Sequence, residues 1–328
     1  MNRRHVMLLL VFLFGAVAVT LSNRYLTFHF NALSQNAYRF LAGGLLLLGL
    51  ASGKFETVRE LLRTRRDLAK TALCGALIAG LMWISITAMS GISAVTASVL
   101  NTLQLPMGIG LAMAFFADER SREPRSFAFG LTGLLIATGA YVWFSHGRPE
   151  AVDHLWAIGL FLLGGTARSG LMLVLKDVLR RHDSLAVACV SAWVCILVML
   201  TAAVATMNLQ SPTHAGPGVA VILIGSGLLG IWVGTALNNE LIHTIGVVRL
   251  HTAAALVPPG VAVAGWVILG ESVSIGQVLA GLAMLLCVMY LTRLKHGTDV
   301  EPDDVPVSEI AAPDFEHAPH EQPGRGVP

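Results

Sequence analysis

The feature that most constrains this chain is a series of ten apolar stretches, each close to the length of a membrane-crossing helix. About 20 largely apolar residues are needed to cross the hydrocarbon core of a bilayer as a helix. Only 13% of the 328 residues are charged, which is too few to cover the surface of a soluble protein of this length. The sequence therefore predicts an all-α membrane protein with ten transmembrane helices, embedded in a lipid bilayer. The predicted spans are residues 6–23, 36–53, 69–88, 92–116, 127–144, 154–175, 184–207, 218–237, 245–269 and 274–292.

The first stretch has an alternative interpretation as a signal peptide. Arg3 and Arg4 precede the apolar run, and Ala16-Val17-Ala18 resembles a cleavage site made of small residues. We favour a transmembrane span because the internal repeat described below needs a helix at this position.

The distribution of lysine and arginine over the predicted loops gives the orientation of the chain. With the amino terminus in the cytoplasm, 18 basic residues fall on the cytoplasmic side and only Arg24, Arg39 and Arg148 fall on the other side. Arg168 belongs to neither group because it lies within a span. Loops rich in Lys and Arg stay in the cytoplasm during membrane insertion. The asymmetry predicts a multi-pass protein of the cytoplasmic (inner) membrane with both termini in the cytoplasm.

The last 33 residues differ in composition from the rest of the chain. Residues 296–328 contain eight acidic residues, one basic residue and six prolines. Such a segment cannot bury enough apolar surface to fold, so we expect a disordered, acidic, proline-rich cytoplasmic tail. The other bases lie in short loops between apolar runs, which argues against nucleic-acid binding. The four cysteines lie within apolar runs and lack the spacing of a metal site, so the sequence predicts no metal and no cofactor.

An internal repeat relates the two halves of the apolar region. Ala94–Glu119 aligns with Gly246–Glu271 at an offset of 152 residues. The aligned pairs are Val95 with Val247, Pro106 with Pro258, Gly108 with Gly260, Ala112 with Ala264, and Glu119 with Glu271. The repeated helix is the fourth and the ninth span, so the repeat unit has five helices. An odd number of spans inverts the second copy in the membrane, as in many secondary transporters. The predicted units are residues 1–147 and residues 148–295, which form two inverted five-helix repeats.

These motifs resemble those of the EamA-type family of the drug/metabolite transporter superfamily. The shared residues are Tyr38-Arg39-Phe40 at the start of the second span, Pro258, Leu269-Gly270-Glu271, Gln277 and Gly281. The resemblance covers residues 6–292, although the first half has Ala117-Asp118-Glu119 in place of Leu-Gly-Glu. It implies ten helices, a central cavity lined by the third, fourth, eighth and ninth spans, and often export of amino acids or related metabolites.

Polar side chains within the spans are the candidates for a substrate cavity, because such groups face the interior of a helix bundle. Asn101 and Gln104 are three residues apart and share one face of the fourth span with Ser98. Arg168 could pair with a carboxylate of the cargo, or its side chain could extend to the cytoplasmic surface. His251 is the histidine placed most clearly within the membrane, and it is the best candidate to carry a coupling proton.

Further candidates shape the cavity rather than bind charge. Thr252 adjoins His251, and Trp83 and Trp266 are candidates for cavity walls, with packing or interfacial anchoring as the alternative for aromatic residues. Four residues are candidates for a hinge or kink, because proline frees a carbonyl in a helix and bends it. They are Pro106, Pro258, Pro259 and Gly260.

The absence of acidic residues near the middle of any predicted span narrows the mechanism. A proton antiporter that works through a buried central carboxylate is not expected, which leaves facilitated diffusion or coupling through His251. Intramembrane proteases need Gly-x-Ser-Gly, two intramembrane Asp residues or His-Glu-x-x-His, and the sequence has none of these patterns. We therefore expect a secondary transporter of a small-molecule substrate and not an enzyme.

The most specific functional prediction is export of an amino acid or related zwitterion by alternating access around a central cavity. Efflux of drugs or other organic solutes is an alternative within the transporters, and a membrane-embedded enzyme is the alternative from another class. The sequence gives no indication of the oligomeric state.

Overall fold

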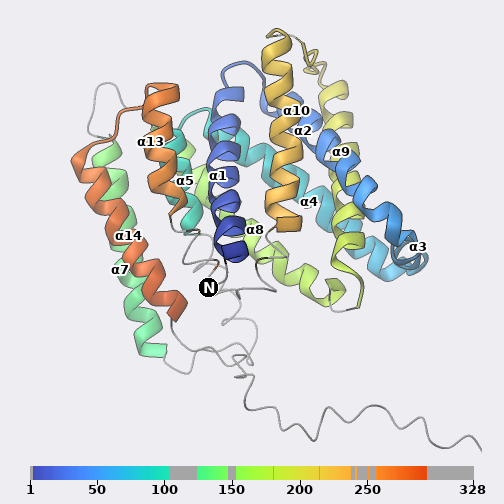
Figure 1. Cartoon of the computed structure of the whole chain (residues 1–328), viewed down its shortest axis with the longest axis horizontal. Coiled ribbons are helices and arrows are strands. Elements are labelled where there is room, and N and C mark those ends of the chain that lie inside the picture. The colour runs from blue at the N-terminus through green and yellow to red at the C-terminus, as the bar shows by residue number, and fades with distance from the viewer. Residues whose placement is uncertain are drawn as a thin grey trace, which may run out of the picture.

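The structure is a computed structural model that describes residues 3–103, 124–146, 153–179, 181–213, 215–237, 241, 250, 254 and 256–293. Over these residues the chain forms eleven α-helices, a 3-10 turn and a π-helical segment (Figure 1). Four predicted site residues and the predicted tail lie outside the described residues. These are Gln104, Pro106, His251, Thr252 and residues 296–328.

The helices follow the predicted apolar stretches to within a few residues at most boundaries. They are α1 (Arg3–Leu26), α2 (Ala32–Ala51), α3 (Phe55–Arg63), α4 (Arg65–Met89), α5 (Ala94–Thr102), α7 (Pro124–His146), α8 (Leu155–Leu179), α9 (Ser184–Ala205), α10 (Pro217–Ile231), α13 (Val257–Leu269) and α14 (Ile275–Arg293). The 3-10 turn η1 (Ser52–Lys54) joins α2 to α3, and the π segment η3 (Trp232–Leu237) continues α10.

Several of these helices have the length and composition of membrane spans. Among the described residues, five helices are long and apolar enough to cross a bilayer, and a sixth is added if α2 and α3 count as one bent span. Large apolar side chains also cover the outside of the bundle, as lipid contact requires. Phe129 and Trp143, for example, are 76% and 78% exposed. An all-helical membrane protein is therefore confirmed, whereas ten spans and two inverted repeats stay predictions.

The helices that begin after short loops have side chains that cap their first turn. Asn31 Oδ1 accepts a hydrogen bond of 2.8 Å from the Ser34 amide at the start of α2. Ser93 Oγ accepts one of 3.1 Å from the Thr96 amide at the start of α5, and Asp183 caps α9 in the same way. Free N–H groups at a helix start need such acceptors, so these residues fix where the spans begin.

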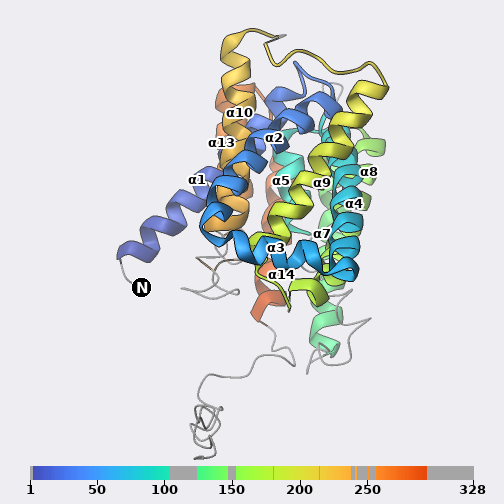
Figure 2. The ribbon, with the colours of Figure 1, turned by 90° about the vertical axis from the view of Figure 1, so that its right-hand side faces the viewer.

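The bundle has two distinct ends, which we name the α3 end and the Arg24 end. At the α3 end, Asp67 of α4 contacts Arg181 and His182 between α8 and α9, at 3.4 Å and 3.0 Å. At the opposite Arg24 end, the Ser34 hydroxyl of α2 donates to the carbonyl of Asn208 after α9, at 2.9 Å. Figure 2 shows the long helices running between these ends, with α3 across one of them and the α9–α10 connection at the other.

Helices from the two halves of the chain pack directly against each other. At one edge α7 packs along α14, and elsewhere α2 contacts both α9 and α10 while α4 contacts both α8 and α9 (Figure 1). The α1 helix lies against α10 and α13. The space between these pairs is where a cavity forms.

A glycine permits the close approach of α2 and α10. A Cβ atom added to Gly227 would lie 2.8 Å from the Cα of Arg39 and closer still to the Arg39 carbonyl oxygen. Real Cβ atoms do not approach backbone this closely, so only glycine fits at position 227. The contact matters for function because Arg39 faces the cavity described below.

The first prediction concerns this contact. Gly227→Ala is expected to lower the free energy of unfolding by about 1–3 kcal/mol, the range for overpacking a tight interior, because the two backbones must separate. Gly225→Ala on the same helix is the matched control, since a Cβ there meets nothing within 4 Å. Thermal unfolding of the two purified variants checks the prediction. Equal midpoints would contradict the tight α2–α10 contact.

Candidate functional site

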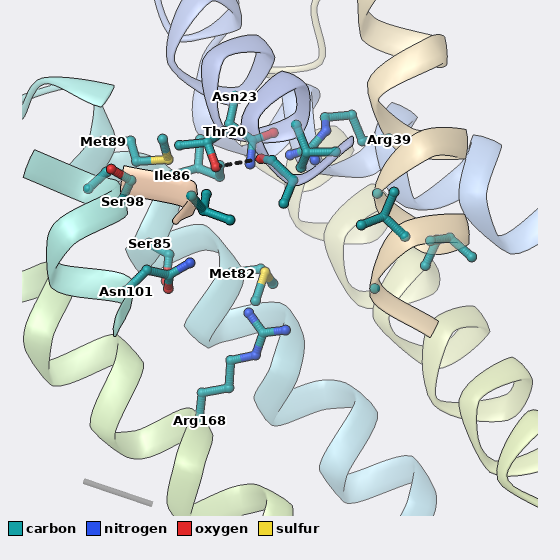
Figure 3. Close-up of a pocket in the computed structure, with 18 of the residues that line it drawn as sticks. Thr20, Asn23, Arg39, Met82, Ser85, Ile86, Met89, Ser98, Asn101 and Arg168 are labelled. Atoms are coloured by element: carbon teal, nitrogen blue, oxygen red, sulfur yellow. Dashed lines mark hydrogen bonds between the residues drawn. The ribbon is translucent and has the colours of Figure 1, made fainter. Parts of the chain in front are cut away.

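A cavity of about 610 Å³ lies between the two halves of the chain, and eight α-helices contribute to its wall. The predicted third, fourth, eighth and ninth spans all take part, as the α4, α5, α10 and α13 helices, and α1, α2, α8 and α14 join them. Its volume suits a small metabolite. The polar side chains that line it are Thr20, Asn23, Arg39, Ser85, Ser98, Asn101, Thr102 and Arg168 (Figure 3).

Arg39 enters the cavity from α2, two turns inside the helix. Its Nε donates to the hydroxyl of Ser226 on α10 at 3.0 Å, which fixes the direction of the side chain. The Ser226 hydroxyl in turn donates to the Leu223 carbonyl at 2.9 Å. A guanidinium has five N–H donors, and the Ser226 bond is its one hydrogen bond within the described residues. The remaining donors lie at the cavity.

Arg168 enters the cavity from α8, thirteen residues from the start of that helix at Leu155. It makes no hydrogen bond or ion pair with any described residue, and its side chain is exposed although it lies deep in the bundle. That exposed surface faces the cavity. Figure 3 shows Arg39 and Arg168 at different levels, with Met82 between them in this view.

Uncharged acceptors and donors lie near the arginines. The Oδ1 atom of Asn23 is buried and accepts no hydrogen bond within the described part of the chain. Asn101 and Ser98 line the wall on α5, and Ser85 lines it on α4, where its hydroxyl donates to the Leu81 carbonyl at 2.8 Å. The cavity can therefore bind a ligand through charged donors at two places and through amide or hydroxyl groups elsewhere.

A buried ion pair lies at the Arg24 end of the bundle, next to the cavity. Arg24 Nε lies 3.5 Å from Glu271 Oε1, and the two side chains are 4% and 8% exposed. Arg24 Nη1 also donates to the carbonyls of Met89 and Ser90, at 2.6 Å and 3.0 Å. Because Met89 and Asn23 line the cavity, this pair lies directly behind the cavity wall.

The same pair is joined to the start of α5. Both carboxylate oxygens of Glu271 accept from the Ala94 amide at 2.9 Å. Asp153 accepts from the Ser93 amide at 2.6 Å and from the Thr96 hydroxyl. Two carboxylates thus neutralise the positive end of the α5 helix dipole. Burial raises the pKa of the Glu271 carboxyl above its usual value, while the Ala94 amide and the charge of Arg24 act in the opposite direction.

The structure places the predicted site residues in three groups. Ser98, Asn101 and Arg168 line the cavity. Trp83 and Trp266 are not among its lining residues, and they are 46% and 67% exposed. Trp83 adjoins Met82, which lines the cavity. One helical step of 100° separates the two side chains, so Trp83 points away from the cavity. Gln104, His251, Thr252 and Pro106 lie outside the described residues, so their cavity or kink roles stay predictions.

The remaining kink candidates lie in the first turn of α13. Pro258 is buried and Pro259 is exposed, and Pro is tolerated in the first turn because its missing N–H would have no helical partner. A Cβ at Gly260 would lie 2.9 Å from Val17 Cγ2, so this glycine brings α13 close to α1. A hinge role for these residues stays a prediction.

One expectation needs correction. Arg39 was expected on the far side of the membrane, at the start of the second span. The α2 helix instead begins at Ala32, which carries Arg39 inward to the cavity. One sequence signal could have indicated that Arg39 lies inside the bundle. Ser226 places a hydroxyl within an apolar span, where it can accept a hydrogen bond from a buried donor. Asn23, Thr20 and Ser85 were also missed.

A helix bundle with an apolar surface and an internal cavity that carries polar groups on its wall is typical of a multi-pass membrane protein of the transporter class. Comparison with known proteins agrees. Residues 155–293, from α8 to α14, match the EamA-like transporter family. An uncharacterized transporter from Haemophilus influenzae is 25% identical over 281 residues, which is 82% of this chain and 91% of that protein.

The fold comparison covers both halves. A protein with a solved crystal structure superposes with a TM-score of 0.55 at 15% identity, over 88% of this chain and 96% of that one, which shows a shared fold. The resemblance indicated by the sequence motifs is thus confirmed: the second half of the chain matches the EamA-like transporter family, and a transporter is its distant relative. That family is a family of transporters and not of enzymes.

Proposed function

We propose that this protein is a secondary transporter that exports a small polar metabolite, an amino acid or related zwitterion, by alternating access. The observation that carries the proposal is the cavity of about 610 Å³, with two guanidinium groups and several amide and hydroxyl groups on its wall. A cargo carboxylate pairs with an arginine, and amide or hydroxyl oxygens of the cavity wall accept from a cargo ammonium.

Alternating access further requires two packings of similar energy, and the helix contacts support a five-helix inverted repeat that would provide them. Each helix has a counterpart five spans away in the other half of the chain. Replacing every helix by its counterpart converts the larger contacts between the halves into one another. The α7–α14, α2–α9 and α5–α13 contacts map onto themselves. The α4–α8 contact maps onto α1–α10, and the α2–α10 contact maps onto α4–α9.

The buried Arg24–Glu271 pair is a candidate gate at the Arg24 end of the cavity in this proposal. We propose that this end faces away from the cytoplasm, since exposed arginines concentrate at the other end. Arg59, Arg63, Arg65 and Arg66 lie on α3 and the start of α4. Loops with this charge remain in the cytoplasm of the inner membrane, so both termini are cytoplasmic in this proposal.

An efflux assay tests the function. Purified full-length protein in proteoliposomes loaded with labelled amino acids is expected to release at least one of them faster than protein-free vesicles. Repeating the assay with and without a pH gradient shows whether a proton is coupled. No protein-dependent release of any amino acid would refute export of this substrate class.

The orientation gives a second prediction, tested on variants whose natural cysteines are replaced. A membrane-impermeant maleimide is expected to label Met207→Cys, at a position that is 93% exposed beyond α9, in intact cells. Arg63→Cys on α3 is expected to react only after the membrane is permeabilised. Labelling of both positions from the same side would overturn the arrangement of the two ends, and the reverse pattern would invert the orientation.

A further inference from the structure

The cavity has a charge imbalance that no protein group described in the structure corrects. Arg39 and Arg168 both line it, and no Asp or Glu is among its described lining residues.

Two guanidinium groups without counter-charges are unfavourable inside a membrane protein. An uncompensated buried charge is strongly destabilising, and ionisable residues within spans persist where they serve a ligand or ion pathway. Arg39 uses one donor on Ser226, and Arg168 uses none on a described residue. Within the described cavity, the counter-charge is left to a ligand.

A single carboxylate does not satisfy both arginines. Arg39 lies seven residues from the start of α2 and Arg168 lies thirteen from the start of α8, and both helices start at the Arg24 end. At 1.5 Å per residue the two positions differ in depth by roughly 9 Å. An extended small molecule with two acidic groups can approach both.

We infer that the cargo is a small organic anion with two acidic groups, of the acidic amino-acid or dicarboxylate type. This inference rests on the proposed transport function and narrows its substrate class. Arg39 and Arg168 each bind one carboxylate, while amide or hydroxyl oxygens of the cavity wall accept from an ammonium where the cargo has one. Basic amino acids are excluded because nothing within the described cavity compensates their added charge.

The test uses pairs of probes that differ only in one charge. Glutamate and glutamine, and succinate and succinamate, have the same shape, because a carboxamide is isosteric with a carboxylate. Binding to the purified full-length protein is measured by calorimetry, and transport is measured in proteoliposomes. The wild type is expected to bind each diacid at least about tenfold more tightly than its amide, since charge-assisted hydrogen bonds are the strong ones.

Substitutions in the cavity identify the groups responsible. Arg39→Gln and Arg168→Gln are each expected to abolish the preference for the diacid, and Arg63→Gln on the exposed face of α3 is the matched control that keeps it. If Arg39 only braced α2 against α10, Arg39→Gln would lower the unfolding midpoint and leave the preference unchanged. Arg39→Lys, which keeps the charge, is expected to retain part of the preference and serves if the glutamine variant does not fold.

The outcomes separate this inference from the proposed function. Equal binding of diacid and amide by the wild type, or no binding of any probe, overturns the inference. Transport of glutamine without preference for glutamate would overturn it while leaving the transporter proposal intact. A diacid preference in binding without flux in vesicles would support the inference and refute transport of this class.

Discussion

Glu271→Gln is expected to lower the free energy of unfolding by about 3–5 kcal/mol, the range measured when one partner of a buried ion pair is removed. The substitution keeps the shape of the side chain but leaves Arg24, which is 4% exposed at its side chain, without a counter-charge. It also removes the carboxylate that accepts from the Ala94 amide at the start of α5. The midpoint of thermal unfolding of the purified protein should fall by several degrees.

Two further variants serve as the control and as the rescue for Glu271→Gln. Glu56→Gln on the exposed face of α3 removes the same charge at the surface and is expected to leave the midpoint unchanged. Combining Arg24→Met with Glu271→Gln removes the unpaired charge, so the double variant should recover part of the loss. A midpoint for Glu271→Gln equal to that of the wild type would mean that the pair does not hold the Arg24 end closed.

Arg168→Ala is expected to reduce efflux by about 10- to 100-fold at substrate concentrations below KM, while the protein still inserts and folds. The loss corresponds to one charge-assisted hydrogen bond to the cargo, about 1.5–3 kcal/mol. Folding should be spared because Arg168 makes no hydrogen bond or ion pair with any described residue.

The matched control is Leu163→Ala on the same helix. Leu163 is 62% exposed on the outside of the bundle, so its truncation removes apolar surface without touching the cavity wall. Size-exclusion profiles and initial efflux rates of both variants check the prediction. Wild-type flux with Arg168→Ala would remove this residue from the binding site.

The sequence predicts the helices well because lipid imposes one simple requirement on them. Within the described residues the apolar runs form helices, and the predicted span 184–207 is observed as α9 (Ser184–Ala205). The all-helical class follows from the same requirement. Ser98, Asn101 and Arg168 could be predicted to face the interior because polar groups avoid hydrocarbon.

Other parts of the site depend on contacts that no local pattern encodes. Arg39 stands near the predicted start of the second span and was assigned to the far side of the membrane, and its tertiary contact with Ser226 is not visible in the local sequence. Glu271 is visible in the sequence as the last residue of a motif, but its partner Arg24 is nearly 250 residues away. Trp83 shows a third limit, since an error of one residue in helix phase turns a side chain from the cavity to the lipid.

The amino end of α5 has a consequence for how tightly the membrane stays sealed. Asp153 before α8 and Glu271 before α14 bind adjacent amides, Ser93 and Ala94, at one helix start. Releasing only one of these carboxylates would leave buried donors and a buried charge unmatched, so half-open arrangements are disfavoured. In the proposed transport cycle, a gate at the Arg24 end would therefore open in a single step or stay shut, which would limit the passive leak of protons and ions between cycles.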